Sequence, residues 1–243
     1  MPPDRIGWTL NPSSWVGNVT VNRPTPSPGA NQPATKPPRL GLIGGVGCGK
    51  SFIAGLFAKL GARVIDADWL GHEALRQPAI RAEVVRHWGR DLLGATGEID
   101  RKKLGAIVFT DAQARKELEA LVFPWIRQHM LEQIRAFERD PNVPLVVLDA
   151  AVMLESGWAE GINWLVFIDV PETIRQARAI HERGWSADEV ERRERAQLPM
   201  EEKRRRAQYV IDNGGSRENS EAQVRGLWQM LGLPSPVANM ESR

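Results

Sequence analysis

A glycine-rich loop at positions 44–51, which reads Gly-Gly-Val-Gly-Cys-Gly-Lys-Ser, constrains the fold of this chain more than any other stretch. An apolar run at 40–43 precedes the loop, and a stretch with helical character at 52–60 follows it. This order of strand, GxxxxGK[ST] loop and helix is the context that a phosphate-binding P-loop requires. Glycines let backbone N–H groups converge on phosphate oxygens, and the N-terminus of the following helix favours an anion. The sequence therefore predicts a nucleotide-binding loop, and the alternative is a glycine-rich turn without a ligand.

The residue types of the loop predict nucleotide phosphates and Mg²⁺ as its ligands, and the family resemblance given below implies that the nucleotide is ATP. Lys50 is expected to reach the β and γ phosphates, and the Ser51 hydroxyl is expected to hold Mg²⁺. The loop residues predicted to contact ATP are Gly45, Gly47, Cys48, Gly49, Lys50 and Ser51.

The composition favours a globular protein without a nucleic acid or membrane partner. Of the 243 residues 42% are hydrophobic, which is typical of a folded chain. The formal charge is only +2, so a polyanion is not required as a partner. No apolar run approaches the roughly 18 residues needed to cross a bilayer. The single cysteine cannot form an intramolecular disulfide. We therefore expect a cytoplasmic protein.

The first 38 residues differ from the rest of the chain. They hold nine of the 17 prolines, and they show no apolar period of a helix or a strand. We expect a disordered tail over residues 1–38 and a second flexible tail over 234–243. Trp8 and Trp15 are the only side chains in the first tail with an evident capacity to dock, and the simpler interpretation is that both lie in a flexible segment.

From residue 39 to residue 233 apolar strand patterns alternate with amphipathic helices. This pattern, with the glycine loop, predicts an α/β P-loop fold with a mainly parallel sheet of five strands flanked by helices. The expected strands are 40–43, 62–65, 145–148, 164–170 and 209–211. Between the second and third lies a long segment, about 69–142, with helical patterns near 77–88 and 112–138. It is too long for a simple crossover, so we expect a helical substrate-binding insertion over the carboxyl edge of the sheet.

Two aspartates follow the second expected strand. In an extended stretch Asp66 and Asp68 would point to the same side, toward the edge that carries the glycine loop. Asp68 is predicted to accept a proton from an attacking hydroxyl, or to orient that hydroxyl. The alternative is that an aspartate here caps the next helix. For Asp66 substrate contact and capping are equally favoured.

Two further acids lie after the third expected strand. The strand ends in Asp149, which resembles a Walker-B acid that holds Mg²⁺ or its water shell. Buried strands often end in aspartate, so this assignment depends on the glycine loop. Glu155 could face substrate or solvent.

Basic residues concentrate late in the chain, between 175 and 206. Glutamates three or four positions away offer partners, so most of these residues are expected on solvated helix faces. A phosphoryl transferase also needs positive charge around the transferring group, often on a mobile lid. We expect a helical lid at about 172–207 and choose Arg183 and Arg193 as its catalytic arginines.

The chain resembles the dephospho-CoA kinases over roughly residues 39–231. The resemblance rests on separated motifs, which read Leu-Ile-Gly-Gly-Val-Gly-Cys-Gly-Lys-Ser at 42–51, Val-Ile-Asp-Ala-Asp at 64–68, Leu-Asp-Ala-Ala-Val-Met-Leu-Glu at 148–155, Ala-Gln-Leu-Pro-Met-Glu-Glu-Lys-Arg at 196–204 and Tyr-Val-Ile-Asp-Asn-Gly-Gly at 209–215. The chain also departs from the family. It has Phe123 before Pro124 where the family has His, Phe52 in place of Thr and Ala151 in place of Pro.

The resemblance implies ATP-dependent phosphorylation of the ribose 3′-hydroxyl of dephospho-CoA, the last step of coenzyme A synthesis. It implies a P-loop kinase fold in which Asp68 contacts the acceptor, the helical insertion binds the CoA moiety and an arginine-bearing lid closes. Asp66 and Glu155 remain further candidates for substrate contact. The resemblance adds Phe52 and Asn213 to the expected ATP contacts. We expect a monomer or a small homo-oligomer.

Two other functions remain open at this point. A related P-loop kinase could act on another nucleoside or nucleotide, because the insertion sets the acceptor. A nucleotide-binding regulator that has lost catalysis is the second, and the Phe123 departure motivates it. A GTPase switch is disfavoured, because the sequence has no Asn-Lys-x-Asp motif.

Overall fold

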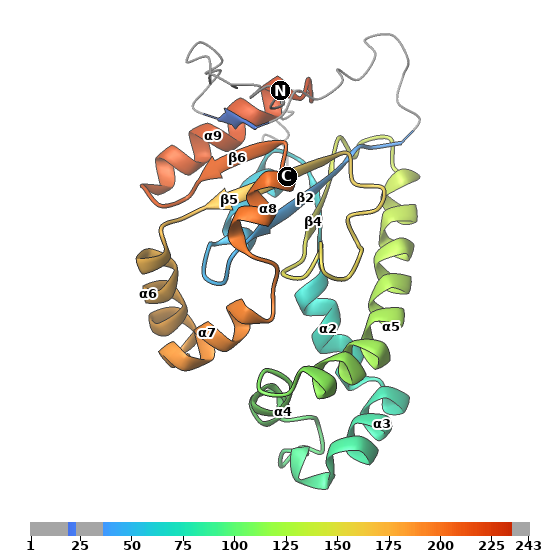
Figure 1. Ribbon diagram of the computed structural model, residues 1–243. Coiled ribbons are helices and arrows are strands. Elements are labelled where there is room, and N and C mark those ends of the chain that lie inside the picture. Colours follow the sequence, from blue (N-terminus) through green and yellow to red (C-terminus); the bar gives the residue numbers. More distant parts are fainter. Residues whose placement is uncertain (1–18, 23–35, 235–243) are drawn as a thin grey trace, which may run out of the picture.

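The structure is a computed structural model that describes residues 19–22 and 36–234. In this part of the chain a central sheet lies between helices on both faces, and a group of helices extends beyond one edge of the sheet (Figure 1). The P-loop kinase fold expected from the sequence is confirmed. No helix among the described residues is long and apolar enough to span a membrane.

The sheet has six strands in the described residues, in the order β1-β6-β5-β2-β4-β3. Their bounds are β1 Thr20–Val21, β2 Arg39–Gly44, β3 Arg63–Asp66, β4 Val146–Asp149, β5 Trp164–Asp169 and β6 Tyr209–Asp212. All neighbouring pairs are parallel except β1 with β6. The central strand β2 lies between β4 and β5, which are both later in the chain. The carboxyl end of β2 is therefore a topological switch point, where ligands bind in this architecture.

The strand count corrects the prediction of five strands, and β1 is the reason. It lies inside the stretch 1–38 that the proline content marked as disordered. Thr20 pairs with Val210, and the preceding Val19 is fully buried in the core. A two-residue strand shows no period in sequence, so only its pairing with β6 defines it. Trp8 and Trp15 lie outside the described residues.

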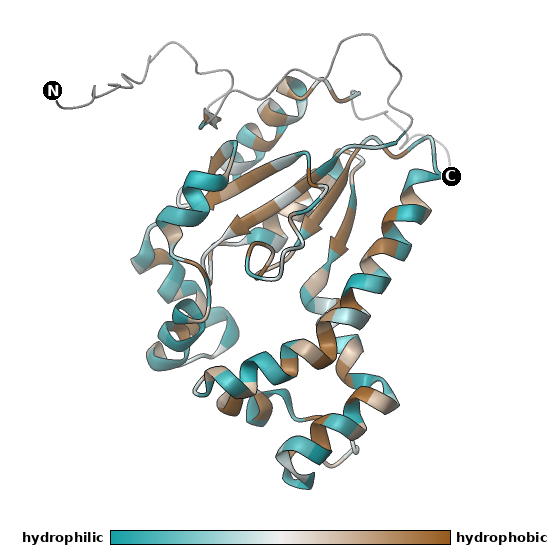
Figure 2. Cartoon of the chain, turned by 45° about the vertical axis from the view of Figure 1, so that its right-hand side comes forward, coloured by the Kyte–Doolittle hydropathy of each residue, from teal (hydrophilic) through white to brown (hydrophobic). Residues whose placement is uncertain are grey.

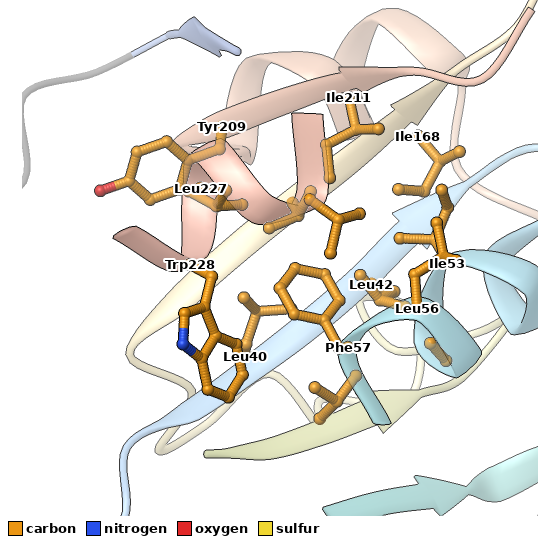
Figure 3. Close-up of a cluster of buried hydrophobic side chains, with 14 of the residues drawn as sticks. Leu40, Leu42, Ile53, Leu56, Phe57, Ile168, Tyr209, Ile211, Leu227 and Trp228 are labelled. Atoms are coloured by element: carbon orange, nitrogen blue, oxygen red, sulfur yellow. The ribbon is translucent and has the colours of Figure 1, made fainter. Parts of the chain in front are cut away.

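Alternate residues of each strand enter separate cores on the two faces of the sheet. In β4, Val147 packs toward helices α1 (Lys50–Lys59) and α9 (Arg217–Met230), and its neighbours pack toward the opposite face. Phe57 of α1 and Trp228 of α9 fill the first core (Figure 3). This burial fixes α1, and α1 in turn fixes the loop that precedes it.

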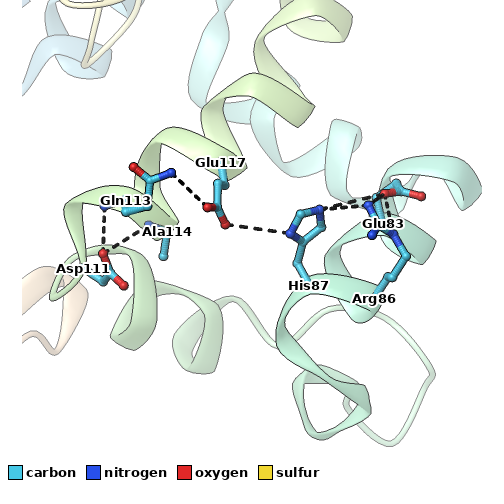
Figure 4. Close-up of polar contacts among 7 residues, drawn as sticks. All are labelled: Glu83, Arg86, His87, Asp111, Gln113, Ala114 and Glu117. Atoms are coloured by element: carbon cyan, nitrogen blue, oxygen red, sulfur yellow. Dashed lines mark hydrogen bonds and ion pairs between the residues drawn. The ribbon is translucent and has the colours of Figure 1, made fainter.

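The helical insertion has its own small core, as the sequence predicts for a subdomain. Its helices are α2 Ala67–Arg76, α3 Pro78–Trp88, the 3₁₀ turn η1 Arg90–Leu92, α4 Arg101–Val108 and α5 Ala112–Glu138. Leu92, Leu104 and Val108 are among the buried residues of that core. Asp111 caps α5, and the ring of His87 in α3 lies 3.8 Å from the Glu117 carboxylate of α5 (Figure 4). The insertion is thus a packed unit joined to the sheet through α2 and α5.

Three helices occupy the stretch expected to form a lid. They are α6 Glu172–Arg183, α7 Ala187–Arg195 and α8 Met200–Arg206. Their surfaces are largely hydrophilic, in contrast to the apolar strands (Figure 2). α6 and α7 lie at the same end of the sheet as the insertion (Figure 1).

Candidate active site

The glycine loop follows β2 and leads directly into α1. Gly47 and Gly49 have φ of 73° and 82°, a left-handed conformation that side chains other than glycine rarely adopt. A Cβ at Gly47 would lie 2.2 Å from the backbone oxygen of Arg175 in α6. Glycine is therefore needed here both for the backbone conformation and for the close approach of the lid.

Three side chains from outside the loop hold its carbonyl groups. Lys203 Nζ donates to the oxygen of Gly44 at 3.3 Å, and Arg175 Nη1 donates to that of Val46 at 3.1 Å. Asn213 Nδ2 donates to the oxygen of Cys48 at 2.9 Å. All three side chains are at least 95% buried, at 1%, 4% and 5% exposure. These contacts therefore support the backbone of the loop from behind.

Lys50, Ser51 and Asp149 form the polar centre next to this loop. Lys50 and Ser51 begin α1, and Asp149 ends β4. Burial opposes the charge of Lys50, but the acidic groups of Cys48, Asp149 and Asp68 outweigh burial and raise the pKa of Lys50. Burial raises the pKa of Asp149, against the effects of Lys50 and Ser51. A cation at this position would favour the charged form of Asp149.

The oxygen atoms of this centre fit the preferences of Mg²⁺. Ser51 Oγ donates to Asp149 Oδ2 at 2.7 Å, so a hydroxyl and a carboxylate lie side by side. Mg²⁺ is usually held by one or two protein oxygens together with water and substrate phosphates. The described residues contain no group of three or more His, Cys, Asp or Glu that could hold a metal. The pair is thus suited to a metal that arrives with a nucleotide.

The structure separates the two aspartates after β3. The stretch is not extended as the sequence argument assumed, because α2 begins at Ala67. Asp66 is the N-cap, and its Oδ1 accepts from Trp69 N at 2.8 Å. Asp68 is exposed in the first turn of α2 and makes no capping bond. Asp66 is therefore the capping residue, and the exposed carboxylate of Asp68 is available to a ligand.

The two lid arginines lie near this centre but differ in their surroundings. Arg183 is exposed at the end of α6, and its positive charge acts to lower the pKa of Lys50. Arg193 is half-buried in α7, and burial lowers its pKa, while the Asp68 carboxylate acts in the opposite direction. Each arginine is thus in electrostatic range of one predicted catalytic group.

Glu155 contacts the lid. Its Oε1 accepts from Leu198 N at 2.7 Å and lies 3.2 Å from Lys203 Nζ. Burial is the main influence that lowers the pKa of Lys203, and Glu155 opposes it. These contacts favour a role for Glu155 in placing Lys203 under the loop, in place of the expected contact with substrate.

The residues expected from family resemblance have the following places. Asn213 supports the loop as described, and its Oδ1 accepts from Ser220 Oγ at 2.8 Å. Phe52 is half-buried in α1 with the Arg217 guanidinium 5.7 Å from its ring centroid. Phe123 packs edge-on against Trp158 at 4.9 Å between ring centroids. Phe52 and Phe123 therefore pack against other side chains of the fold, at two of the positions where the chain departs from the family.

A small pocket of about 180 Å³ lies on the insertion next to Asp68. Its lining includes Trp69, His72, Arg76 and Arg101. Trp69 is 53% exposed, an unusual exposure for so large an apolar side chain. Glu73 and Glu98 also line it, and Arg76 pairs with Glu73 at 2.6 Å, so the pocket offers an aromatic surface with groups of both charges near the predicted acceptor carboxylate.

Sequence reasoning missed Arg175 and Lys203. Both belong to the charge-rich stretch that was interpreted as mostly solvated, and both are buried under the glycine loop. The sequence carries no signal that separates them from exposed neighbours such as Arg205, because only the docking of α6 and α8 on the loop buries them.

The fold and this centre define a P-loop kinase, and comparison with known proteins gives its family. A family model described as dephospho-CoA kinase matches residues 39–219, so the chain belongs to the dephospho-CoA kinase family. It is 41% identical to the dephospho-CoA kinase of Geobacter sulfurreducens, over 78% of this chain and 96% of that protein. It is 38% identical to that of Aquifex aeolicus, over 79% and 97%.

Solved structures share the fold of this chain. A crystal structure of a Thermus thermophilus protein matches with a TM-score of 0.68 and 34% identity, over 81% of this chain and 98% of that one. The dephospho-CoA kinase of Campylobacter jejuni matches with a TM-score of 0.59 and 27% identity, over 79% and 96%. The relatives are thus covered almost completely.

Proposed function

We propose that this chain transfers the γ-phosphoryl group of ATP to the ribose 3′-hydroxyl of dephospho-CoA, which yields coenzyme A. The observation that carries the proposal is the placement of Lys50 and Asp68 just after strands β2 and β3, whose carboxyl ends lie at the same edge of the parallel sheet. Lys50 begins α1 after the glycine loop, and Asp68 lies in the first turn of α2. The acidic groups of Cys48, Asp149 and Asp68 together raise the pKa of Lys50 against the effect of burial. A phosphate-binding cation and an exposed carboxylate therefore meet at one edge of the sheet.

The residues divide into roles as follows. The loop N–H groups, from Gly45 to Ser51, and Lys50 bind the phosphates of ATP. Asp68 accepts the proton of the acceptor hydroxyl. The hydroxyl oxygen bonds to the γ phosphorus while the bond between that phosphorus and the β–γ bridging oxygen breaks. ADP then leaves. Arg183 and Arg193 add positive charge around the transferring group.

Ser51 and Asp149 would hold Mg²⁺ with the nucleotide, and the metal supplies charge neutralisation at the β and γ phosphates. Asn213 holds the Cys48 carbonyl from behind the glycine loop, and Phe52 lies in α1 directly after that loop. The pocket lined by Trp69 and His72 is the proposed place where the insertion contacts the acceptor, next to Asp66 and Asp68.

The remaining expectations are also proposals. The protein functions in the cytoplasm with small-molecule substrates, as a monomer or a small homo-oligomer, and light scattering of the purified chain tests the latter. Residues 1–38 and 234–243 lie outside the kinase domain proper, with β1 as the part of the first segment that joins the sheet.

The test is an ATP consumption assay on the purified protein with dephospho-CoA, AMP, CMP and adenosine as parallel acceptors. Product mass then identifies a phosphate added to the acceptor. Turnover that requires dephospho-CoA supports the proposal. A preference for another acceptor supports a related kinase, and nucleotide binding without turnover on any acceptor supports a regulator.

A further inference from the structure

One cation joins the lid to the insertion. The Arg193 guanidinium of α7 lies 3.9 Å from the ring centroid of Trp185, in the loop between α6 and α7. It also lies 4.2 Å from the ring centroid of Phe109, which caps the end of α4. Both distances are well inside the roughly 6 Å range of cation–π attraction. The lid and the insertion therefore meet at the Trp185–Arg193–Phe109 stack.

The stack is oriented by an ion pair. Glu189, one turn earlier in α7, accepts from Arg193 Nε at 3.2 Å and from Nη2 at 2.8 Å through one oxygen. Glu189 thereby holds the guanidinium in place while its central carbon lies close to both rings. Arg193 is half-buried here, and cation–π attraction is stronger where water is partly excluded.

The two rings differ in what they are attached to. Phe109 packs against the core of the insertion, beside Leu104 and Val108 of α4. Trp185 packs against a cluster made of Val190 and Ala179 of the lid and Val46 of the glycine loop. The stack thus joins the insertion to the lid, and its cation lies in electrostatic range of Asp68, on the acceptor side.

We propose that Phe109 and Trp185 are positioning residues, which hold Arg193 across the active-site edge so that the insertion and the lid act on the phosphoryl transfer together. The proposal rests on the role proposed above for Arg193. Replacement of either aromatic ring by an aliphatic side chain should therefore impair turnover and the use of the acceptor. ATP binding should change little, because Lys50 and the glycine loop are supported by other side chains.

The competing explanation is that Phe109 only fills space in the insertion. Leucine and tyrosine separate the two explanations, because leucine keeps the apolar character without the π face, and tyrosine keeps the face. For Phe109→Leu we expect kcat to fall about tenfold, which corresponds to about 1.4 kcal/mol. For Phe109→Tyr we expect kcat within about twofold of the wild type. The KM for ATP should stay within about twofold in both variants.

The experiment measures kcat, both KM values and thermal unfolding for these two variants, for Arg193→Gln and for Phe109→Leu combined with Arg193→Gln. Phe137→Leu is the matched control, since Phe137 is half-buried in α5 and lies outside the stack. The stack predicts that Phe109→Leu has no further effect on kcat once Arg193 is replaced. Equal kcat for the leucine and tyrosine variants overturns it, and so does a full leucine effect in the Arg193→Gln background.

The outcomes also separate this inference from the proposed function. If the wild type shows no turnover with dephospho-CoA, the proposed function fails, and the stack is then tested on the acceptor that the protein does phosphorylate. If Arg193→Gln keeps wild-type kcat, the role of Arg193 fails and the positioning proposal is overturned with it.

Discussion

The donor side and the acceptor side of the active site are built in different ways. On the donor side, the glycine loop rests on Arg175, Lys203 and Asn213, none of which is more than 5% exposed. On the acceptor side, Asp68 and Trp69 are exposed on the first turn of α2. The ATP phosphates would thus meet a preformed surface, whereas the acceptor would meet side chains that still face solvent.

This difference follows from the positions of the elements. The donor side lies at the centre of the sheet, where β2 is flanked by strands on both sides and covered by helices on both faces. The acceptor side lies between two helical groups at the sheet edge, which meet at few points. The sheet and its helices therefore support the donor side. The lid and the insertion are joined through contacts such as the Arg193 stack.

The largest expected effect breaks the donor side at its functional group. Lys50→Ala should reduce kcat/KM by on the order of 10³ or more, because it removes the cation that stabilises the transferring phosphoryl group. The fold should remain, as judged by circular dichroism and thermal unfolding. Lys59→Ala is the control, since that side chain is 73% exposed at the far end of the same helix. Near wild-type turnover of Lys50→Ala would contradict the assignment.

The next effect tests the acceptor side. Asp68→Asn should reduce kcat by a factor on the order of 10² or more, the usual span for a general base, with nucleotide affinity unchanged. Asp66→Ala is the matched comparison, and it should lower the free energy of unfolding by about 1 kcal/mol through loss of the cap. Kinetics and denaturant titration of both variants check this division. A loss of stability without a loss of turnover in Asp68→Asn would make it a structural residue.

Loss of support behind the loop should appear first as lost stability. Lys203→Met removes a buried cation from Glu155, Gln197 and the Gly44 carbonyl, and should lower the free energy of unfolding by about 3 kcal/mol. The KM for ATP should rise with it. Arg205→Met, on the exposed face of the same helix, should change stability by less than about 0.5 kcal/mol. Equal stability of the two variants would show that the loop needs no such support.

Deletion of residues 1–35 tests the edge of the sheet. Sequence alone predicts no effect on unfolding, whereas the structure predicts a loss of about 2 kcal/mol, because Val19 is fully buried. The melting temperature should fall by about 6 °C with little change in kcat. Val19→Ser in the full chain should reproduce most of the loss. An unchanged melting temperature would show that β1 contributes nothing.

The smallest effect concerns pH. Because burial lowers the pKa of Lys203, the folded protein binds fewer protons than the unfolded chain between that lowered value and 10.5. The free energy of unfolding should therefore gain a positive slope with pH in this window, of at most about 1.4 kcal/mol per pH unit. Comparison of the wild type with Lys203→Met at each pH isolates the contribution. The same slope in both proteins would contradict it.

Much of the fold and part of the site could be predicted from local sequence. The glycine loop, the strand ends at Asp66 and Asp149 and the helical insertion each have a signal within a few consecutive residues. The P-loop kinase fold and five of the strands were predicted correctly for this reason. The periodicity of apolar residues is itself a consequence of burial on a sheet or a helix face.

Which charged residues are buried depends on the packing of distant segments. Arg175 and Arg205 look alike in the sequence, yet one lies under the glycine loop and the other faces solvent. The same holds for the pairing of β1 with β6 and the meeting of Phe109 with Arg193. Local patterns specify the elements because their causes lie within one or two turns of chain. Contacts between distant segments depend on how those elements pack, and no short stretch of sequence contains that information.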